Sequence, residues 1–133
     1  MDFQNLIDAA FEVLKPRRVS PSVDAGGVAA ALVTDRGNVY RGVCLDTSCS
    51  LGFCAEHAAV AAMLTAGEDK PVQIVAVGYD GKVWVPCGRC RELLHQINPG
   101  CQVLLPDGKT VHTVEELLPW AWVSPDAQEE PQA

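Results

Sequence analysis

The sequence predicts a single α/β domain in which helices cover a β-sheet. This prediction depends on the length of 133 residues, the hydrophobic content of 48%, and the alternation of helix-like segments with pairs of strand-like segments. A chain of this length buries roughly two thirds of the surface that its unfolded form exposes. Alternating helices and strand pairs are typical of a sheet packed against helices. The sequence contains no internal repeat that would indicate a second domain.

The N-terminal part predicts a helix followed by a β-hairpin. Over residues 3–14 the apolar side chains recur at spacings of three and four, which traces one face of a helix. Lys15-Pro16 then ends this helix. Two apolar runs, residues 27–33 and 39–43, flank the turn-forming segment 34–38, and we expect them to pair as a hairpin.

The middle of the chain predicts a helix and a second strand pair. Residues 44–53 are expected to form a loop that leads into an alanine-rich helix over residues 55–66. Residues 72–79 are nearly all apolar, as in a central strand that is buried on both faces. Asp80-Gly81 then turns the chain into a short strand at 82–85.

The C-terminal part predicts a third helix, two short strands and a final helical turn. The helix covers residues 89–97 and stops at Asn98-Pro99-Gly100. Short strands are expected at 101–105 and 110–112. Thr113 and Glu116 have the spacing of a capping box, which opens the last helical turn.

Composition and charge limit the partners and the compartment. We expect residues 1–124 to form the domain and the acidic, proline-bearing segment 125–133 to be disordered. The net charge is −7, with 10 Lys and Arg against 17 Asp and Glu, which disfavours binding of a nucleic acid backbone. No apolar run approaches the ~20 residues that span a membrane, and residues 1–4 lack a basic signal region. The prediction is a cytoplasmic protein that acts on a small molecule, without a membrane or nucleic acid partner.

Two cysteine clusters carry most of the functional information. They are Cys54-Ala55-Glu56-His57 and Pro86-Cys87-Gly88-Arg89-Cys90. In a reducing compartment, clustered cysteines indicate a metal site or catalysis rather than disulfides. A structural zinc site has four protein ligands, whereas a catalytic zinc site leaves one position open for water. Three thiols beside one carboxylate therefore predict a catalytic zinc ion bound by Cys54, Cys87 and Cys90.

The placement of the thiols at helix starts favours thiolates. Cys87 and Cys90 are three residues apart and share one face of a helical turn, and Cys54 begins another helix. Helix N-termini carry positive partial charge, which lowers the pKa of a thiol. Three thiolates nevertheless leave the zinc site with net negative charge. The basic residues expected to lie close by and offset this charge are His57, Arg89 and Arg91.

Over about residues 24–123 the sequence resembles the cytidine deaminase family, including its blasticidin S deaminase branch. The resemblance is carried by Ala29-Ala30-Ala31-Leu32, Cys54-Ala55-Glu56, Pro86-Cys87-Gly88-Arg89-Cys90-Arg91 and Thr113-Val114-Glu115-Glu116-Leu117-Leu118-Pro119. It implies a three-layer α/β/α sandwich with a mixed five-stranded sheet and a zinc-dependent aminohydrolase that releases ammonia. It also implies a homo-oligomer, a tetramer in preference to a dimer, whose subunits lend residues to one another's pockets.

The resemblance assigns Glu56 as the catalytic acid/base. Glu56 follows Cys54 by two residues, so it can face the open position of the metal without binding it. It would take a proton from the attacking water and deliver it to the ring nitrogen and then to the leaving amine. The expected reaction is hydrolytic deamination of a cytidine-like nucleoside or a related small amino-heterocycle.

The residues that would recognise the substrate depart from the family pattern. The family's Asn-x-Glu motif for the ribose is matched by Cys44 and Asp46, a Phe that packs on the base falls near Gly26, and an Arg after Ala-Glu is His57. We therefore expect a remodelled pocket. The substrate-binding residues that the resemblance implies are Cys44, Asp46, Ala55, Val85 through its backbone carbonyl, Trp120 and Trp122.

Alternatives remain open at this point. A structural zinc site would need a fourth ligand such as His57, Cys49 or Cys44, and a histidine directly after Glu56 is expected to point away from Cys54. Cys44, Cys49 and Cys101 are expected to be packed or loop cysteines. Trp120 and Trp122 are expected either to cover the core or to close a pocket, in the same or a neighbouring subunit. In function, the alternatives are an aminonucleoside-antibiotic deaminase and a non-catalytic binding subunit, against which the intact Glu56 argues.

Overall fold

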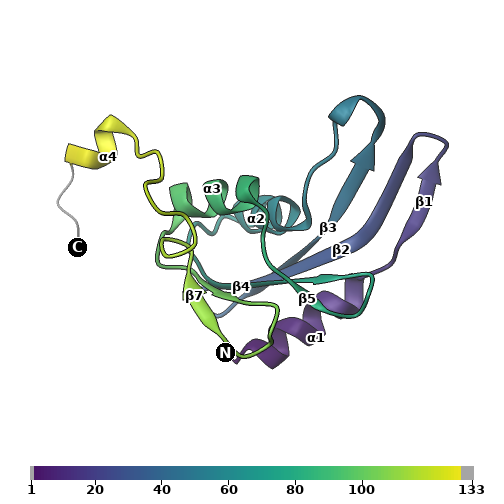
Figure 1. The fold of residues 1–133 in the computed structure, drawn as a ribbon, viewed down its shortest axis with the longest axis horizontal. Coiled ribbons are helices and arrows are strands. Elements are labelled where there is room, and N and C mark those ends of the chain that lie inside the picture. The colour runs from purple at the N-terminus through teal and green to yellow at the C-terminus, as the bar shows by residue number, and fades with distance from the viewer. Residues whose placement is uncertain (1, 130–133) are drawn as a thin grey trace.

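The computed structural model describes residues 2–129 and shows one β-sheet between two helical layers (Figure 1). Helix α1 covers one face of the sheet, and α2 and α3 cover the other, which confirms the predicted three-layer α/β/α arrangement. The elements are α1 (Phe3–Val13), β1 (Arg17–Ser20), β2 (Val23–Thr34), β3 (Val39–Thr47), the 3₁₀ turn η1 (Ser48–Ser50), α2 (Ala55–Thr65), β4 (Pro71–Gly78), β5 (Val83–Trp84), α3 (Gly88–Ile97), β6 (Gln102–Leu104), β7 (Val111–Thr113) and α4 (Pro125–Glu129).

The sheet has seven strands rather than the five that were expected. Five of them form the continuous order β3-β2-β4-β6-β7, in which only β4 and β6 are parallel. The other two strands, β1 and β5, pair with end segments of β2 and β4. Strand β1 pairs with the start of β2, before the segment that pairs with β4, and β5 pairs with the end of β4, beyond the segment that pairs with β6.

The structure corrects two local expectations and confirms a third. Strand β1 was not predicted, because Arg17–Ser20 is a short, exposed, basic edge segment without apolar alternation. Strand β3 extends to Thr47, so the first part of the expected loop at 44–53 is strand. Residues 113–119 keep the predicted capping box, since the Thr113 and Glu116 side chains bond each other's backbone N–H. The Leu117 N–H bonds the Thr113 carbonyl at 3.2 Å, so the predicted helical turn forms, but it does not continue as a helix. Pro119 disfavours continuation of a helix at the residue before it.

The C-terminal segment differs in part from the expected disorder. Residues Pro125–Glu129 form the short helix α4, which lies away from the sheet in Figure 1, and residues 130–133 lie outside the described part of the chain. Among residues 2–129, none of the helices has both the length and the apolarity needed to cross a bilayer.

Strands β2 and β4 divide the core into two clusters because their side chains alternate between the faces. Ala30 and Leu32 point toward α2 and α3, whereas Ala31 and Val33 point toward α1. All four residues are buried. The small side chains of α2 let that helix approach β3 closely: a Cβ on Gly42 would lie 2.3 Å from the Ala59 backbone nitrogen. This close approach fixes the start of α2, where the first cysteine cluster lies.

A buried carboxylate joins the end of α2 to the β2–β3 hairpin. Glu68 is 5% exposed. It accepts hydrogen bonds from the Thr34 hydroxyl at 2.6 Å and from the Asn38 amide at 2.9 Å, and a third from the Tyr40 hydroxyl. These bonds, the one from Thr34 first, lower the pKa of Glu68 below its ordinary value of 4.5. The folded state therefore favours the ionised form of this side chain.

We expect this cluster to make stability depend on pH. Because the pKa of Glu68 is lower in the folded chain, its contribution is complete above its unfolded-state pKa and disappears as the pH falls below about 4.5. Glu68→Gln should lower the melting temperature by several degrees at neutral pH, and this difference should shrink on acidification. Thermal melts across that pH range, with the exposed Glu115→Gln as control, test this. A difference that stays constant with pH would contradict it.

Candidate active site

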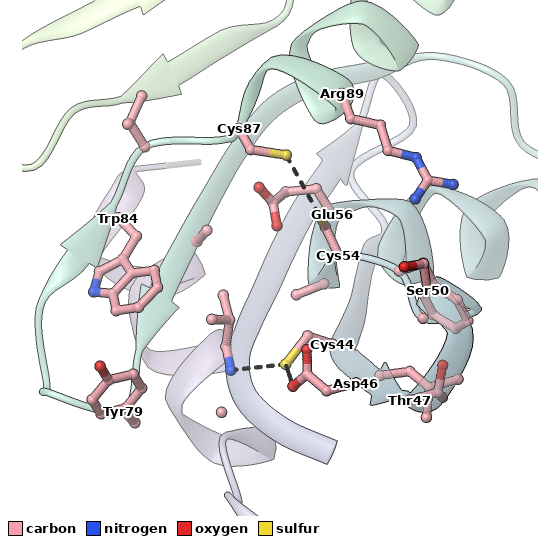
Figure 2. A pocket seen from close by; sticks show the side chains of 18 residues that line it. Cys44, Asp46, Thr47, Ser50, Cys54, Glu56, Tyr79, Trp84, Cys87 and Arg89 are labelled. Carbon is pink, nitrogen blue, oxygen red and sulfur yellow. Dashed lines mark hydrogen bonds between the residues drawn. The ribbon is translucent and has the colours of Figure 1, made fainter. Parts of the chain in front are cut away.

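Two helix starts bring three thiols together (Figure 2). Cys54 is the N-cap of α2 and Cys87 is the N-cap of α3, with Cys90 in the first turn of α3. The Cys54 and Cys87 sulfurs are 3.4 Å apart, and the Cys87 and Cys90 sulfurs are 3.5 Å apart. All three are free thiols. The predicted clusters, 33 residues apart in sequence, therefore meet at one point.

The donor set fits a zinc ion. Two thiolates bound to one tetrahedral zinc at about 2.3 Å lie about 3.8 Å apart, close to the separations found here. The ligand atoms of Cys54, His57 and Cys90 also lie within 4.8 Å of one another, as a metal site requires. The structure thus offers four neighbouring donors. The Cys87 sulfur approaches both other sulfurs, whereas the His57 ring contacts the Cys90 sulfur.

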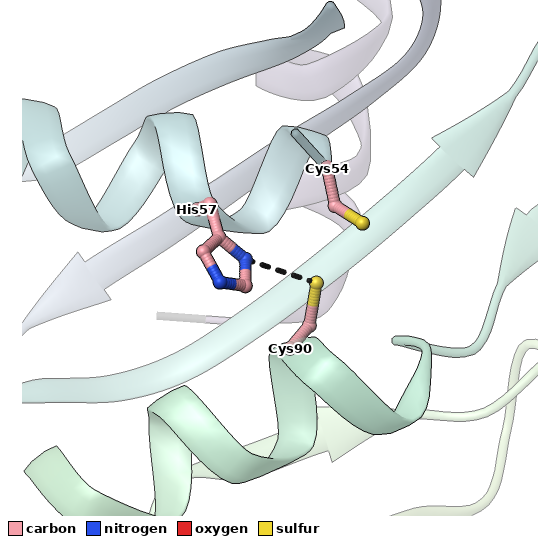
Figure 3. Close-up of side chains that lie close together, drawn as sticks. All are labelled: Cys54, His57 and Cys90. Carbon is pink, nitrogen blue, oxygen red and sulfur yellow. Dashed lines mark hydrogen bonds between the residues drawn. The ribbon is translucent and has the colours of Figure 1, made fainter. Parts of the chain in front are cut away.

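His57 faces the thiols, contrary to the expectation that it points away (Figure 3). Its Nδ1 lies 3.3 Å from the Cys90 sulfur. The physical reason is the spacing of three residues between Cys54 and His57, which places both on one side of the first helical turn. Burial, and then the nearby Arg89 guanidinium, lower the pKa of His57. His57 is therefore placed to donate to a thiolate or to act as a fourth donor.

The thiols differ in acidity, and only one follows the helix-end prediction. For Cys87, burial acts to raise the pKa, but backbone N–H groups of α3 and the neighbouring thiols outweigh it and the pKa is lowered. The pKa of Cys54 is raised, by burial first and then by the bond with Cys87. Burial and the nearby Glu56 carboxylate raise the pKa of Cys90 strongly. The expectation of a lowered pKa is therefore wrong for Cys54 and holds for Cys87.

Glu56 lies beside the thiols with little access to solvent. Its side chain is 4% exposed and belongs to the wall of the neighbouring cavity. Figure 2 shows its carboxylate below Cys87 and next to Cys54. Burial raises the pKa of Glu56, and backbone and Cys90 hydrogen bonds lower it by less. A carboxyl with a raised pKa is suited to both accept and return a proton near neutral pH.

An open cavity of about 670 Å³ lies against Glu56 and the thiols. Its size falls within the range of small-molecule sites. Strand β3 supplies part of its wall, which explains the predicted role of the segment around Asp46. The sequence-predicted residues that line it are Cys44, Asp46, Cys54, Ala55, Glu56, Val85, Cys87 and Arg89.

Other predicted site residues lie elsewhere in this chain. Trp120 is fully exposed and Trp122 is 60% exposed, so neither covers the core, and both border a second cavity near α4. Arg91 donates to the backbone carbonyls of Pro86 and Leu117 at 2.9 and 3.1 Å instead of bonding a thiol. Gly26 packs against the backbone of Lys15 and does not line the first cavity, whereas its neighbour Gly27 does.

The polar side of the cavity is formed by the end of β3. The backbone N–H of Val28 donates to the Cys44 sulfur at 3.3 Å, and the Cys44 thiol donates to Asp46 at 3.7 Å. Thr47 also lines the cavity, and its buried hydroxyl oxygen has no hydrogen-bond partner among the described residues. This side therefore presents the Asp46 carboxylate to a ligand.

Sequence reasoning missed the aromatic part of the cavity wall. Tyr79 and Trp84, at the two ends of the β4–β5 hairpin, line the cavity together with Phe53. The two hairpin rings pack edge to face with centroids 5.4 Å apart. The signal in the sequence was the position of Trp84 directly before Val85-Pro86-Cys87, whereas residues 82–85 were predicted only as a short strand.

Comparisons with known proteins agree with the geometry. The chain is 33% identical over 96 residues to the cytidine deaminase of Mycobacterium tuberculosis, covering 71% of each chain. It is 35% identical over 103 residues to the blasticidin-S deaminase of Bacillus cereus, covering 69% of this chain and 74% of the relative. The crystal structure of the Mycobacterium leprae cytidine deaminase superposes with a TM-score of 0.76 at 28% identity, over 90% of this chain and 98% of that one. No protein-family model matches the chain.

The identity over most of each chain, the shared fold and the meeting of three thiols beside a buried glutamate lead to one conclusion. The chain belongs to the cytidine deaminase family and is a zinc-dependent hydrolytic deaminase.

Proposed function

We propose that this enzyme deaminates a cytidine-like nucleoside or a related small amino-heterocycle, with Cys54, Cys87 and Cys90 as zinc ligands and Glu56 as the catalytic acid/base. The observation that carries this proposal is the buried Glu56 carboxylate, which lines an open cavity beside the mutually adjacent thiols. The names of the relatives supply the substrate class.

Each residue of the site has a separate role in the proposed reaction. Cys54, Cys87 and Cys90 would hold the zinc ion, which would supply an acidified water as nucleophile at neutral pH. Glu56 takes one proton from the attacking water and gives it to the ring nitrogen, and then transfers the second proton to the departing amine. Arg89, at the edge of the cavity, offsets the negative charge of the thiolates, and His57, 3.3 Å from the Cys90 sulfur, is placed to donate a hydrogen bond to that sulfur. The carbonyl of Val85 accepts a hydrogen bond from the amine as it leaves.

The substrate pocket is remodelled relative to a typical nucleoside deaminase. The Asp46 carboxylate is the group available for substrate hydroxyls on this side of the cavity. The Cys44 thiol already accepts a hydrogen bond from the Val28 N–H and donates one to Asp46, so it is a poor hydrogen-bond partner for a sugar hydroxyl. Gly27 leaves the adjoining space open, since a Cβ there would have no atom within 4 Å. The pocket therefore accommodates a bulkier ring system or substituent.

An ammonia-release screen tests the proposal. The panel holds cytidine, deoxycytidine, free and modified cytosines, blasticidin S, aminopurines, pterins and triazines, each with the zinc-loaded protein. We expect release from at least one compound, and no release with Glu56→Gln. Efficient deamination of unmodified cytidine and deoxycytidine alone would contradict the remodelled pocket. No ammonia release from any compound of the panel would contradict the proposed substrate class.

Blasticidin S is the second candidate substrate, because the identity to the Bacillus cereus blasticidin-S deaminase is 35%. It carries a cytosine on a larger, sugar-derived scaffold, which suits the space beside Gly27. In the same screen, a kcat/KM for blasticidin S well above that for cytidine would identify an antibiotic deaminase. The opposite order would identify a nucleoside deaminase.

We propose that the chain assembles as a homotetramer in the cytoplasm, with a dimer as the alternative. The fully exposed Trp120 and the 60% exposed Trp122 support a contact between subunits, in which these rings reach the cavity of a neighbour. Reduced thiols for a zinc site require a reducing compartment, and all six cysteines are free. Light scattering on the eluted protein measures the assembly, and a monomer at working concentration would contradict it.

A further inference from the structure

The β4–β5 hairpin holds one aromatic ring rigidly against the cavity. The Nε1–H of Trp84 donates to Asp80 at 2.9 Å, and Asp80 also accepts from the Lys82 backbone N–H at 3.1 Å. Tyr79 packs its ring against the indole edge to face. A Cβ on Gly78 would lie 2.1 Å from the indole, so only glycine lets the ring rest on this strand. The indole is therefore fixed on three sides.

The free side of this ring faces the substrate site. Trp84 lines the same cavity as Glu56 and Cys54. Figure 2 shows it with Tyr79 on the wall opposite Asp46 and Thr47, with the nitrogen edge of the indole turned away from Glu56. The backbone runs from Trp84 through Val85 and Pro86 directly to Cys87. The position of the indole is therefore tied to that of a thiol of the metal site.

We propose that Trp84 is a specificity-determining residue whose indole packs on the heteroaromatic ring of the substrate. The inference rests on the proposed deaminase function. A planar base gains affinity by packing on an aromatic side chain, and the gain tolerates changes in the base. Gly27, which also lines the cavity, has no side chain, and a Cβ there would have no atom within 4 Å. Trp84 thus aligns the amine-bearing carbon with Glu56 while leaving room for substituents toward Gly27.

Steady-state kinetics on cytidine and blasticidin S test the packing. Trp84→Leu should raise KM about tenfold with a smaller change in kcat, and Trp84→Phe should keep most of the affinity. Lys82→Ala, in the same hairpin but outside the cavity lining, is the matched control and should keep the wild-type KM. Zinc content and melting temperature identify a variant that has merely lost its structure. A wild-type KM for Trp84→Leu would overturn the inference.

A binding measurement decides the point without turnover. The chain has 3 tryptophans, so Trp120→Phe/Trp122→Phe in a Glu56→Gln background leaves Trp84 as the only indole. Titration with cytidine or blasticidin S, excited at the red edge of the tryptophan band, should quench its emission saturably. Absence of saturable quenching with both probes, in a variant whose equilibrium dialysis still shows bound probe, would overturn the inference. Failure of the proposed function is a separate result, namely no ammonia release by the wild-type enzyme.

Discussion

Glu56→Gln should abolish deamination while leaving the zinc ion bound. The amide keeps the size of the side chain but can neither accept nor return a proton. General acid/base groups contribute about 10²- to 10⁴-fold to rate, and Glu56 serves more than one transfer, so we expect a loss of about 10³-fold or more. Because Glu56 is buried beside the thiols without being one of the neighbouring metal donors, the variant should fold and bind zinc. Ammonia release and metal analysis of the same sample measure both effects.

The matched control for this variant is Glu115→Gln, which removes an exposed carboxylate outside the cavity and should keep wild-type activity. A Glu56→Gln enzyme that retains activity within about tenfold of the wild type would refute the acid/base role, because loss of a general base costs about 10²-fold at least. Loss of zinc together with loss of activity would instead make Glu56 part of the metal site.

Removal of any one of the three thiols should eliminate zinc binding. Cys54→Ala, Cys87→Ala and Cys90→Ala each leave two sulfur donors, and because zinc binding stabilises the folded chain, the melting temperature should fall with the zinc content. Activity should disappear in all three variants. Metal analysis and thermal melts measure the effect. The control is Cys49→Ser, since Cys49 is exposed and lies apart from the thiol cluster.

The same variants separate two possible donor sets. If the zinc ligands were Cys54, His57 and Cys90, then Cys87→Ala would keep its zinc and His57→Ala would lose it. We expect the reverse, because the Cys87 sulfur lies 3.4 and 3.5 Å from the other two. His57→Ala should keep zinc and lose about 10- to 100-fold in activity, as is usual when the partner of a metal ligand is removed.

Much of the zinc site could be predicted from sequence because its geometry is local. Cys87 and Cys90 share a helical turn by their spacing alone, and the N-cap positions of Cys54 and Cys87 follow from the start of two amphipathic or alanine-rich segments. The same rule of spacing, applied to His57, would have placed it on the thiol side of α2. That error arose from incomplete use of the pattern and not from missing information.

The substrate wall could not be predicted in this way. It combines the end of β3, the β4–β5 hairpin and two helix starts, and no local period records that these segments meet. Glu68 is a similar case, since its partners Thr34, Asn38 and Tyr40 lie about 30 residues earlier. No local pattern in the sequence marks Glu68 as buried, whereas the fold buries it among three donors.

The sequence by itself determined the helices, the buried strand β4, the thiol spacing and the placement of Glu56 beside a cysteine, because these depend on neighbours within one or two turns. The tertiary structure alone decided that the two cysteine clusters meet, that Trp84 and Asp46 face each other across one cavity, and that Trp120 and Trp122 lie outside it. Strand order and helix packing bring distant segments together, and substrate recognition depends on those long-range contacts.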